Sequence, residues 1–131
     1  MILLDTHVLL WLCIQPQKLS RPAVRAIERA AKSGGLAIAS ITLLEVAWLF
    51  AHDRIRAAGS VSSSVRDILD ASRASVLEIT PEVAATAVQL PQSLPADPAD
   101  RLIVATAVAH ALSLVTRDAR ILDSGVCRTV W

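Results

Sequence analysis

The 131-residue chain is long enough to bury a substantial core, and we interpret residues 1–131 as one domain. Hydrophobic residues make up 53% of it and charged residues only 19%. This apolar excess favours a helix-rich interior together with a subunit or partner interface; an unusually apolar monomer is the alternative. The net charge of +1 excludes a global attraction to nucleic acids or to membrane surfaces.

The start of the sequence does not resemble a signal peptide, and its longest apolar stretch is a poor membrane span. Met1 to Asp5 lack the basic segment of a signal peptide, and the apolar stretch from Leu36 to Phe50 is interrupted by polar residues. We therefore expect a cytoplasmic protein that does not cross a membrane. Cys13 and Cys127 lie far apart in apolar surroundings, which indicates two buried thiols rather than a disulfide framework or a zinc site.

In chain order, the first elements are short apolar strands and the helices that follow them. Ile2–Leu4 and Leu36–Ala39 are typical of fully buried strands. Val8–Ile14 is predicted to be helical, and Ala23–Lys32 has the pattern of an amphipathic helix that ends at Gly34 and Gly35. Its predicted apolar face consists of Val24, Ile27 and Ala31.

The rest of the chain continues the alternation. A helix begins at Ser40 or Thr42, and a polar connection over 52–64 follows it. The remaining predicted elements are helices over 65–72, 83–90 and 99–111 and strands over 76–79, 114–116 and 126–130. Short apolar strands alternating with helices indicate an α/β fold: a mostly parallel central sheet with helices on both faces.

Four acidic residues occur where these apolar elements begin or end. Asp5 and Asp118 come just after strands, so both are expected at the carboxyl edge of the sheet, where α/β proteins place their sites. Glu45 and Asp100 reach the same edge on helix starts. Helix capping is the alternative for Asp5, and a capping box formed by Thr42 and Glu45 is the alternative for Glu45.

The stretch from Asp97 to Asp100 leads a polar turn into a strongly apolar helix. Asp97 suits the N-cap and Pro98 the first helical position, where a missing N–H costs nothing. Asp100 falls in the first turn, where the helix dipole favours a carboxylate. Capping explains Asp97 well and Asp100 only partly, which points to a site at the start of this helix.

Four carboxylates in one semi-buried pocket cannot all stay ionised without compensation. Either repulsion raises some of their pKa values, or a hard cation neutralises them. Oxygen ligands without Cys or His suit Mg²⁺ or Mn²⁺, and phosphodiester hydrolysis is the natural reaction of such a centre. The sequence has neither a phosphate-binding P-loop nor a Gly-x-Ser-x-Gly nucleophile turn.

The segments around these acids resemble the four acidic motifs of PIN domains, and most closely those of VapC-type toxins. They are Ile-Leu-Leu-Asp5-Thr-His, Ser-Ile-Thr-Leu-Leu-Glu45-Val-Ala, Asp-Pro-Ala-Asp100-Arg-Leu-Ile-Val-Ala-Thr-Ala and Leu-Val-Thr-Arg-Asp118. The resemblance covers essentially the whole chain in order and spacing. It implies a three-layer α/β/α sandwich, Mg²⁺-dependent endoribonuclease activity with Mn²⁺ as a substitute, a homodimer, and a cognate antitoxin whose tail blocks the acidic groove.

Carried over residue by residue, the resemblance makes Asp5, Glu45, Asp100 and Asp118 the catalytic, metal-binding acids. Asp97 is expected to cap its helix or support the site rather than to bind metal directly. Thr6 and Thr116 are expected to orient carboxylates or hold a metal-bound water, and Arg101 to pair with an acid or contact a phosphate.

Two other readings belong to different functional classes. A phospho-accepting receiver domain would have paired acids after its first strand and a lysine after a late strand, whereas Asp5 is followed by Thr6 and His7 and the final third has no lysine. A nuclease-like scaffold that serves only as a binding subunit would keep the acids and fail to bind Mg²⁺.

Overall fold

The computed structural model describes residues 1–131 and contains a five-stranded sheet in the order β3–β2–β1–β4–β5. Every neighbouring pair of strands is parallel, so the predicted mostly parallel sheet is confirmed and has no antiparallel strand. The strands are β1 (Ile2–Leu4), β2 (Leu36–Ala39), β3 (Ser75–Leu77), β4 (Leu114–Val115) and β5 (Thr129–Val130).

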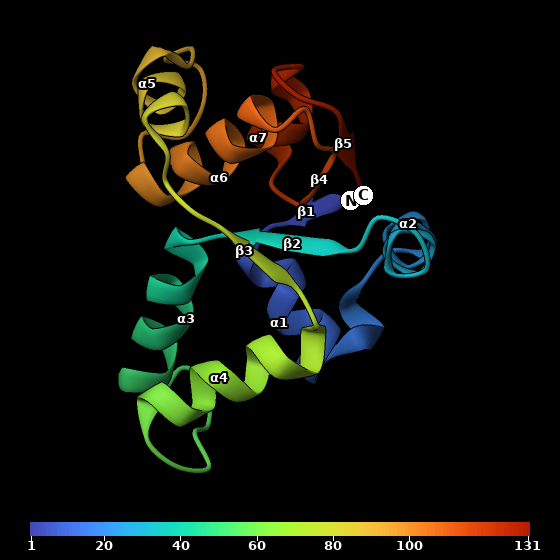
Figure 1. Cartoon of the computed structure of the whole chain (residues 1–131), viewed down its shortest axis with the longest axis vertical. Coiled ribbons are helices and arrows are strands. Elements are labelled where there is room, and N and C mark those ends of the chain that lie inside the picture. The colour runs from blue at the N-terminus through green and yellow to red at the C-terminus, as the bar shows by residue number, and fades with distance from the viewer.

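Helices cover both faces of the sheet, as the expected three-layer sandwich requires. Figure 1 shows α1, α3 and α4 on one side of the sheet and α5, α6 and α7 on the other. The first layer comprises α1 (Thr6–Ile14), α2 (Arg21–Ala31), α3 (Ile41–Ala51) and α4 (Val61–Ser72), with a 3₁₀ turn at Pro16–Lys18. The second comprises α5 (Pro81–Gln89), α6 (Pro98–Ala109) and α7 (Ala119–Ser124).

The central strand β1 divides the core in two. Side chains alternate along a strand, so Leu4 joins the core under α1 to α4 while Leu3 joins the core under α5 to α7. Neither residue is exposed to solvent. Ile38 and Ala37 of β2 divide in the same way. Burial on both faces explains why these strands are uninterrupted apolar runs.

The order of the strands places a crevice beside β1. The chain moves from β1 through β2 to β3 on one side and then crosses over to place β4 on the other side of β1. The strand order therefore reverses between β1 and β4, and ligands of parallel sheets bind outside the carboxyl ends at such a point. Asp5 follows β1 and Thr116 follows β4 at this crevice.

Helix starts follow the local capping rules. The side chains of Ser20, Ser60, Thr80 and Asp97 each accept a hydrogen bond from a backbone amide in the first turn of α2, α4, α5 and α6. The predicted start at Asp97-Pro98 is therefore confirmed.

Three predicted elements differ from the structure by more than two residues at one end or in the face that they bury. Helix α4 begins at Val61 rather than Val65, because the Ser60 hydroxyl accepts a hydrogen bond from the Ser63 amide at 3.1 Å and draws the serine-rich segment into the helix. The expected strand over 126–130 is reduced to β5, because its partner β4 is itself two residues long and pairs only with Thr129 and Val130. The predicted apolar face of α2, Val24, Ile27 and Ala31, is wrong at two positions: the buried residues are Ala23, Ile27 and Ala30.

Cys13 and Cys127 are free, half-buried thiols. Burial raises the pKa of both, which is the behaviour of inert structural cysteines. No helix has the length and apolar character that crossing a bilayer requires.

We expect Leu3→Ala to lower the free energy of unfolding by about 2–5 kcal/mol, because it removes a buried side chain from the central strand. The control Ile79→Ala alters an isoleucine that is 47% exposed and should change it by at most about 1 kcal/mol. Urea denaturation measures both values, and equal effects of the two substitutions would contradict the assignment of the core.

Candidate active site

One cavity of about 430 Å³ gathers the predicted acids at the carboxyl edge of the sheet. The side chains that line it are Asp5, Thr6, His7, Trp11, Glu45, Asp97, Asp100, Arg117 and Asp118. The structure thus brings together the four acids from four separate segments of the chain and adds Asp97 as a fifth. Of the remaining predicted site residues, Thr116 does not line the cavity but donates a hydrogen bond to Asp5, and Arg101 does not line the cavity either.

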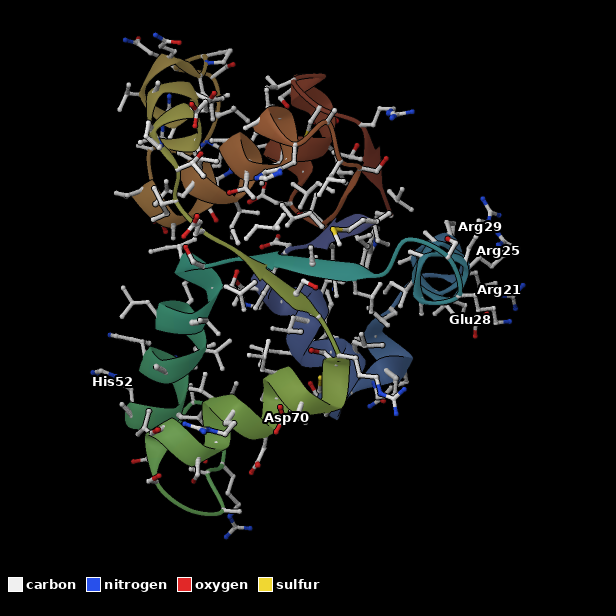
Figure 2. The ribbon with its side chains drawn as sticks, in the orientation of Figure 1. Arg21, Arg25, Glu28, Arg29, His52 and Asp70 are labelled. Carbon is white, nitrogen blue, oxygen red and sulfur yellow. The ribbon has the colours of Figure 1, made fainter.

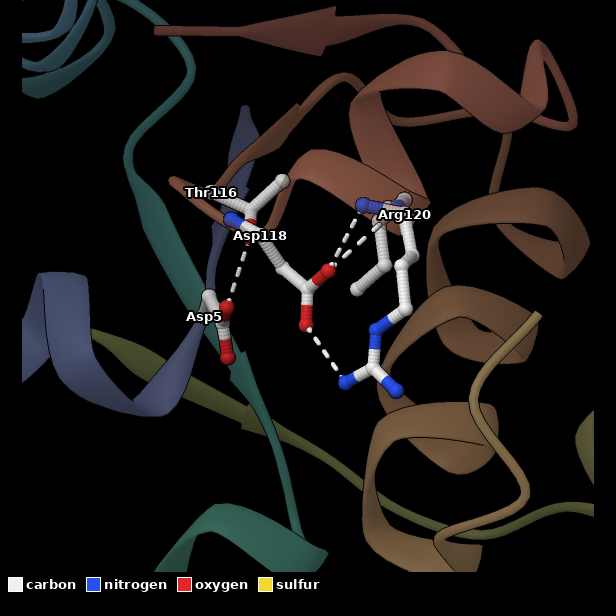
Figure 3. Close-up of polar contacts among 5 residues, drawn as sticks. Asp5, Thr116, Asp118 and Arg120 are labelled. Carbon is white, nitrogen blue, oxygen red and sulfur yellow. Dashed lines mark hydrogen bonds and ion pairs between the residues drawn. The ribbon is translucent and has the colours of Figure 1, made fainter.

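Asp5 caps a helix and faces the cavity at the same time. Its Oδ1 accepts a hydrogen bond from the Thr6 amide at 2.7 Å, and its Oδ2 accepts one from the Thr116 hydroxyl at 2.7 Å. The Thr116 oxygen in turn accepts a hydrogen bond from the Asp118 amide at 3.1 Å. Figure 3 shows Thr116 beside Asp5, and the Asp118 carboxylate between Asp5 and Arg120. Thr116 therefore fixes the orientation of Asp5 and ties the loop after β4 to the end of β1.

Glu45 is held by a hydroxyl of another helix rather than by its own helix start. The Thr6 hydroxyl donates to Glu45 Oε1 at 2.6 Å, and the Thr42 hydroxyl lies 3.0 Å from the same Thr6 oxygen. Because the single Thr6 hydroxyl hydrogen is used on the carboxylate, Thr42 is the donor to Thr6 when Glu45 is ionised. The capping box of Thr42 and Glu45 does not form, since Ser40 occupies the N-cap position of α3.

Asp97 and Asp100 take different roles at the start of α6. Asp97 is exposed, and its Oδ1 accepts a hydrogen bond from the Ala99 amide at 2.9 Å, so it is the N-cap residue. Asp100 lies in the first turn and is half-buried, and its carboxylate accepts no hydrogen bond from any protein group. Asp100 is therefore the cavity acid whose oxygens are free to bind something else.

Asp118 is the most fully engaged of the acids. It caps α7, where its Oδ1 accepts hydrogen bonds from the Arg120 amide at 2.9 Å and the Ile121 amide at 3.4 Å. Its Oδ2 forms an ion pair with the Arg120 guanidinium at 3.3 Å (Figure 3). These contacts leave Asp118 fewer free lone pairs than Asp100 or Glu45.

Burial, together with the crowding of the carboxylates, changes their acidity. Burial first, and then the neighbouring charge of Asp97, raise the pKa of Asp100 from its ordinary value of 3.8 to about 6, and the other cavity acids add to this shift. Burial also raises the pKa of Glu45, and the hydrogen bond from Thr6 opposes the rise. A fully ionised cavity is therefore costly to the folded protein at neutral pH.

The residues of the cavity fit a hydrated hard cation. No three of its acidic or imidazole groups lie close enough together to ligate one ion directly. Mg²⁺ does not require that arrangement, because it keeps several waters and binds through one or two carboxylates. The donors are almost all carboxylate and hydroxyl oxygens, with His7 as the single imidazole and no thiol, which suits Mg²⁺ or Mn²⁺ better than Zn²⁺.

Arg101 follows Asp100 in sequence but contacts none of the acids. Its guanidinium donates to the backbone carbonyls of Leu90 at 2.6 Å, Ala87 at 3.2 Å and Pro91 at 3.2 Å. These carbonyls belong to the end of α5 and the following turn, and carbonyls at a helix end lack partners within the helix. The expected contact of Arg101 with an acid or a phosphate is thus replaced by a contact that joins α5 to α6.

The sequence did not lead us to assign three residues that line the cavity to the site. His7 and Trp11 face it because they lie on one side of α1, and Arg117 because it precedes Asp118 in the loop after β4. The four-residue spacing of His7 and Trp11 is a usable sequence signal. Thr42 offers no such signal, because its role depends on the packing of α3 against α1.

Comparison with known proteins identifies the family. The family model of the PIN domain matches residues 2–125. The chain belongs to the PIN-domain family. This PIN domain is also 47% identical over 132 residues to "Ribonuclease VapC22" of Mycobacterium tuberculosis (strain ATCC 25618 / H37Rv), an alignment that covers 99% of this chain and 98% of that protein. The resemblance to VapC-type PIN domains is thereby confirmed.

Solved structures show the same fold. VapBC2 from Rickettsia felis, crystallised with a fragment of promoter DNA, contains a chain that matches with a TM-score of 0.73 and 20% identity over 98% of this chain and 97% of that one. A toxin–antitoxin complex from Klebsiella pneumoniae contains a chain with a TM-score of 0.68 and 27% identity over 100% of this chain and 97% of that one.

We expect Asp100→Asn to raise the melting temperature of the metal-free protein at about pH 8. The pKa of Asp100 is about 6 in the folded protein and 3.8 ordinarily, so the folded state binds the proton more tightly and the wild type gains stability as the pH falls between these values. Asn does not titrate. The advantage of the variant is therefore largest above about pH 7 and disappears below about pH 4.

Thermal unfolding in EDTA across this pH range measures the difference. Addition of Mg²⁺ at about pH 8 should then raise the melting temperature of the wild type more than that of the variant, because a bound cation offsets the repulsion. A variant no more stable than the wild type at high pH would show that the acids of the cavity do not strain the fold.

We expect Arg101→Ala to lower the free energy of unfolding by about 1.5–3 kcal/mol, because three backbone carbonyls lose a charged donor. Arg120→Ala is the matched control: it removes an exposed ion pair and should cost at most about 1 kcal/mol. Urea denaturation distinguishes the two, and a neutral Arg101→Ala would show that the contact with α5 contributes nothing to stability.

Proposed function

We propose that this PIN domain is a metal-dependent endoribonuclease that hydrolyses RNA phosphodiester bonds at the acidic cavity. The observation that carries the proposal is the meeting of Asp5, Glu45, Asp100 and Asp118 in one cavity where Asp100 has no protein partner and a pKa raised to about 6. The 47% identity to a protein named as a ribonuclease supports the choice of RNA as substrate.

Mg²⁺ is the proposed cofactor, and Mn²⁺ is expected to substitute for it. Asp100 offers two free oxygens and Glu45 one, while each Asp5 oxygen keeps a lone pair beyond its hydrogen bond. These three residues would hold the ion directly or through its waters, and the more engaged Asp118 would act mainly through water. When bound, such an ion polarises the phosphoryl oxygen and offsets the charge that develops during hydrolysis.

The protein groups around the acids orient them for the reaction. Thr116 and Thr6 hold Asp5 and Glu45 in fixed orientations through the hydrogen bonds at 2.7 and 2.6 Å. Burial raises the pKa of Glu45, which makes its carboxylate a better acceptor of a proton from the attacking water near neutral pH. We assign catalytic roles to Asp5, Glu45, Asp100 and Asp118, and helix capping to Asp97.

The biological role that we propose is that of a toxin. Two of the similar structures are a VapBC complex and a toxin–antitoxin complex, which supports regulation of this chain by a cognate antitoxin. Cleavage of RNA in the cytoplasm would then inhibit translation or growth until the antitoxin binds. Leu44, Trp48 and Val88 are large apolar side chains that are 50% to 81% exposed, which supports the further proposal of a homodimer.

Asp5→Asn and Asp100→Asn should each reduce cleavage of total RNA by at least about a hundredfold, because each removes a charge that the metal and the transition state require. The measurement compares the purified proteins with Mg²⁺, with Mn²⁺ and with EDTA. Induced expression should inhibit growth with the wild type and not with these variants.

The matched control is Asp70→Asn, which alters an exposed acid on α4. Figure 2 shows Asp70 on this helix, well away from α6. This variant should cleave like the wild type. Full cleavage by both active-site variants, or cleavage by the wild type that persists in EDTA, would overturn the proposed function.

A further inference from the structure

A second cavity of about 340 Å³ adjoins the acidic one. Helix α1 forms one wall of it, and the end of α3 with the loop that follows forms the other. His7 and Trp11 line both cavities, so the two share a wall. The volume lies within the range of about 300–1,000 Å³ that is usual for small-molecule sites.

The face of α1 forms a continuous path from the acids into this cavity. His7, Trp11 and Ile14 lie on one side of the helix, and all three line the second cavity. With a rise of about 1.5 Å per residue, the path from His7 to Gln15 is about 12 Å long. A flexible polymer whose reacting bond lies at the acids therefore reaches the second cavity with its adjoining units.

This path is positively charged where the first cavity is negative. Arg54 and Arg56 line the second cavity, and no acidic residue does. The only ion pair of the structure joins Arg120 to Asp118, so neither arginine is paired with a carboxylate. Lys18 Nζ and Arg117 Cζ each lie 5.9 Å from the centre of the Trp11 ring, which adds two cations at the junction of the cavities.

A substrate with phosphates needs such charges, because the acids alone repel it. The floor of the second cavity is apolar and includes Leu10 and Ile14. Unpaired arginines beside aromatic and apolar side chains are the combination that binds single-stranded nucleic acid: the cations hold the backbone, and the bases lie against the rings. Such a surface suits a single nucleic-acid strand better than a duplex, because the bases of a duplex are already stacked on one another.

We propose that this second cavity binds the single-stranded RNA next to the cleaved bond, with Arg54 and Arg56 on its phosphates and Trp11 beside its bases. The proposal rests on the proposed ribonuclease function and deepens it, because it says how a chain with almost no net charge holds a polyanion beside five carboxylates.

The other exposed arginine cluster is a poor alternative and a good control. Arg21, Arg25 and Arg29 are exposed on α2, and Figure 2 shows them pointing outward from that helix. Helix α2 lies at the opposite end of β2 from α3, away from the acids (Figure 1). An RNA strand bound at the acidic cavity does not need these arginines.

The test is RNA binding by the full chain carrying Asp100→Asn, so that the RNA stays uncut. A fluorescently labelled single-stranded RNA of about 12 nucleotides is titrated at salt concentrations from about 50 to 200 mM. Adding Arg54→Ala and Arg56→Ala should weaken binding severalfold. It should also reduce the slope of log K against log salt by about 1.4, because each contact with a single-strand phosphate contributes about 0.7. Arg25→Ala with Arg29→Ala should change neither quantity.

An unchanged affinity and slope in the Arg54 and Arg56 variant would overturn the proposal while leaving the ribonuclease function in place. An equal loss in the α2 control would also overturn it, by showing a general charge effect. If the Asp100→Asn chain with both arginines intact binds no RNA, this proposal and the proposed function are overturned together. An acidic amphipathic peptide serves as a competing probe: if it binds in place of RNA, and only this binding is lost in the variant, the cavity belongs to a protein partner.

Discussion

Mutual repulsion among five carboxylates at the carboxyl edge of the sheet is the constraint on which the site depends. The parallel sheet creates it, because β1 and β4 end side by side and each is followed by an acid, while α3 and α6 bring Glu45 and Asp100 to the same crevice. Burial, and then the repulsion from the neighbouring acids, raise the pKa of Asp100 to about 6, so protonation of this carboxylate relieves part of the cost. A hard cation would relieve it at neutral pH, so the geometry that strains the site also prepares it for metal.

The fold withstands this strain through hydroxyl groups and backbone carbonyls. Thr116 links the ends of β1 and β4, and Thr6 with Thr42 links α1 to α3, so Asp5 and Glu45, which lack a cationic partner, are each held by a threonine hydroxyl. Arg101 binds the end of α5 and thereby fixes the start of α6, on which Asp100 lies. The result is an acidic cavity whose walls stay in place, continued by a basic path along α1.

Local signals explain which parts of this arrangement the sequence predicts. The strands β1 and β2 are buried on both faces and so appear as plain apolar runs, and the N-cap Asp97 acts within one turn. Glu45 shows where such signals fail: its spacing from Thr42 satisfies the capping rule, but its actual partner, Thr6, lies 39 residues away. No local sequence pattern predicts that Arg101 binds the carbonyls at the end of α5. Helix α7 is too short to show the hydrophobic period of a helix.

The most direct test of the central claim is the number of protons released when Mg²⁺ binds, measured by calorimetry in buffers of different ionisation enthalpy. If the ion relieves the repulsion among the acids, binding at about pH 6 displaces a substantial fraction of a proton, because the pKa of Asp100 is about 6, and this release vanishes by about pH 8. Asp100→Asn should lose most of it. Binding without proton release at either pH, or no binding by the folded wild type, would contradict the account.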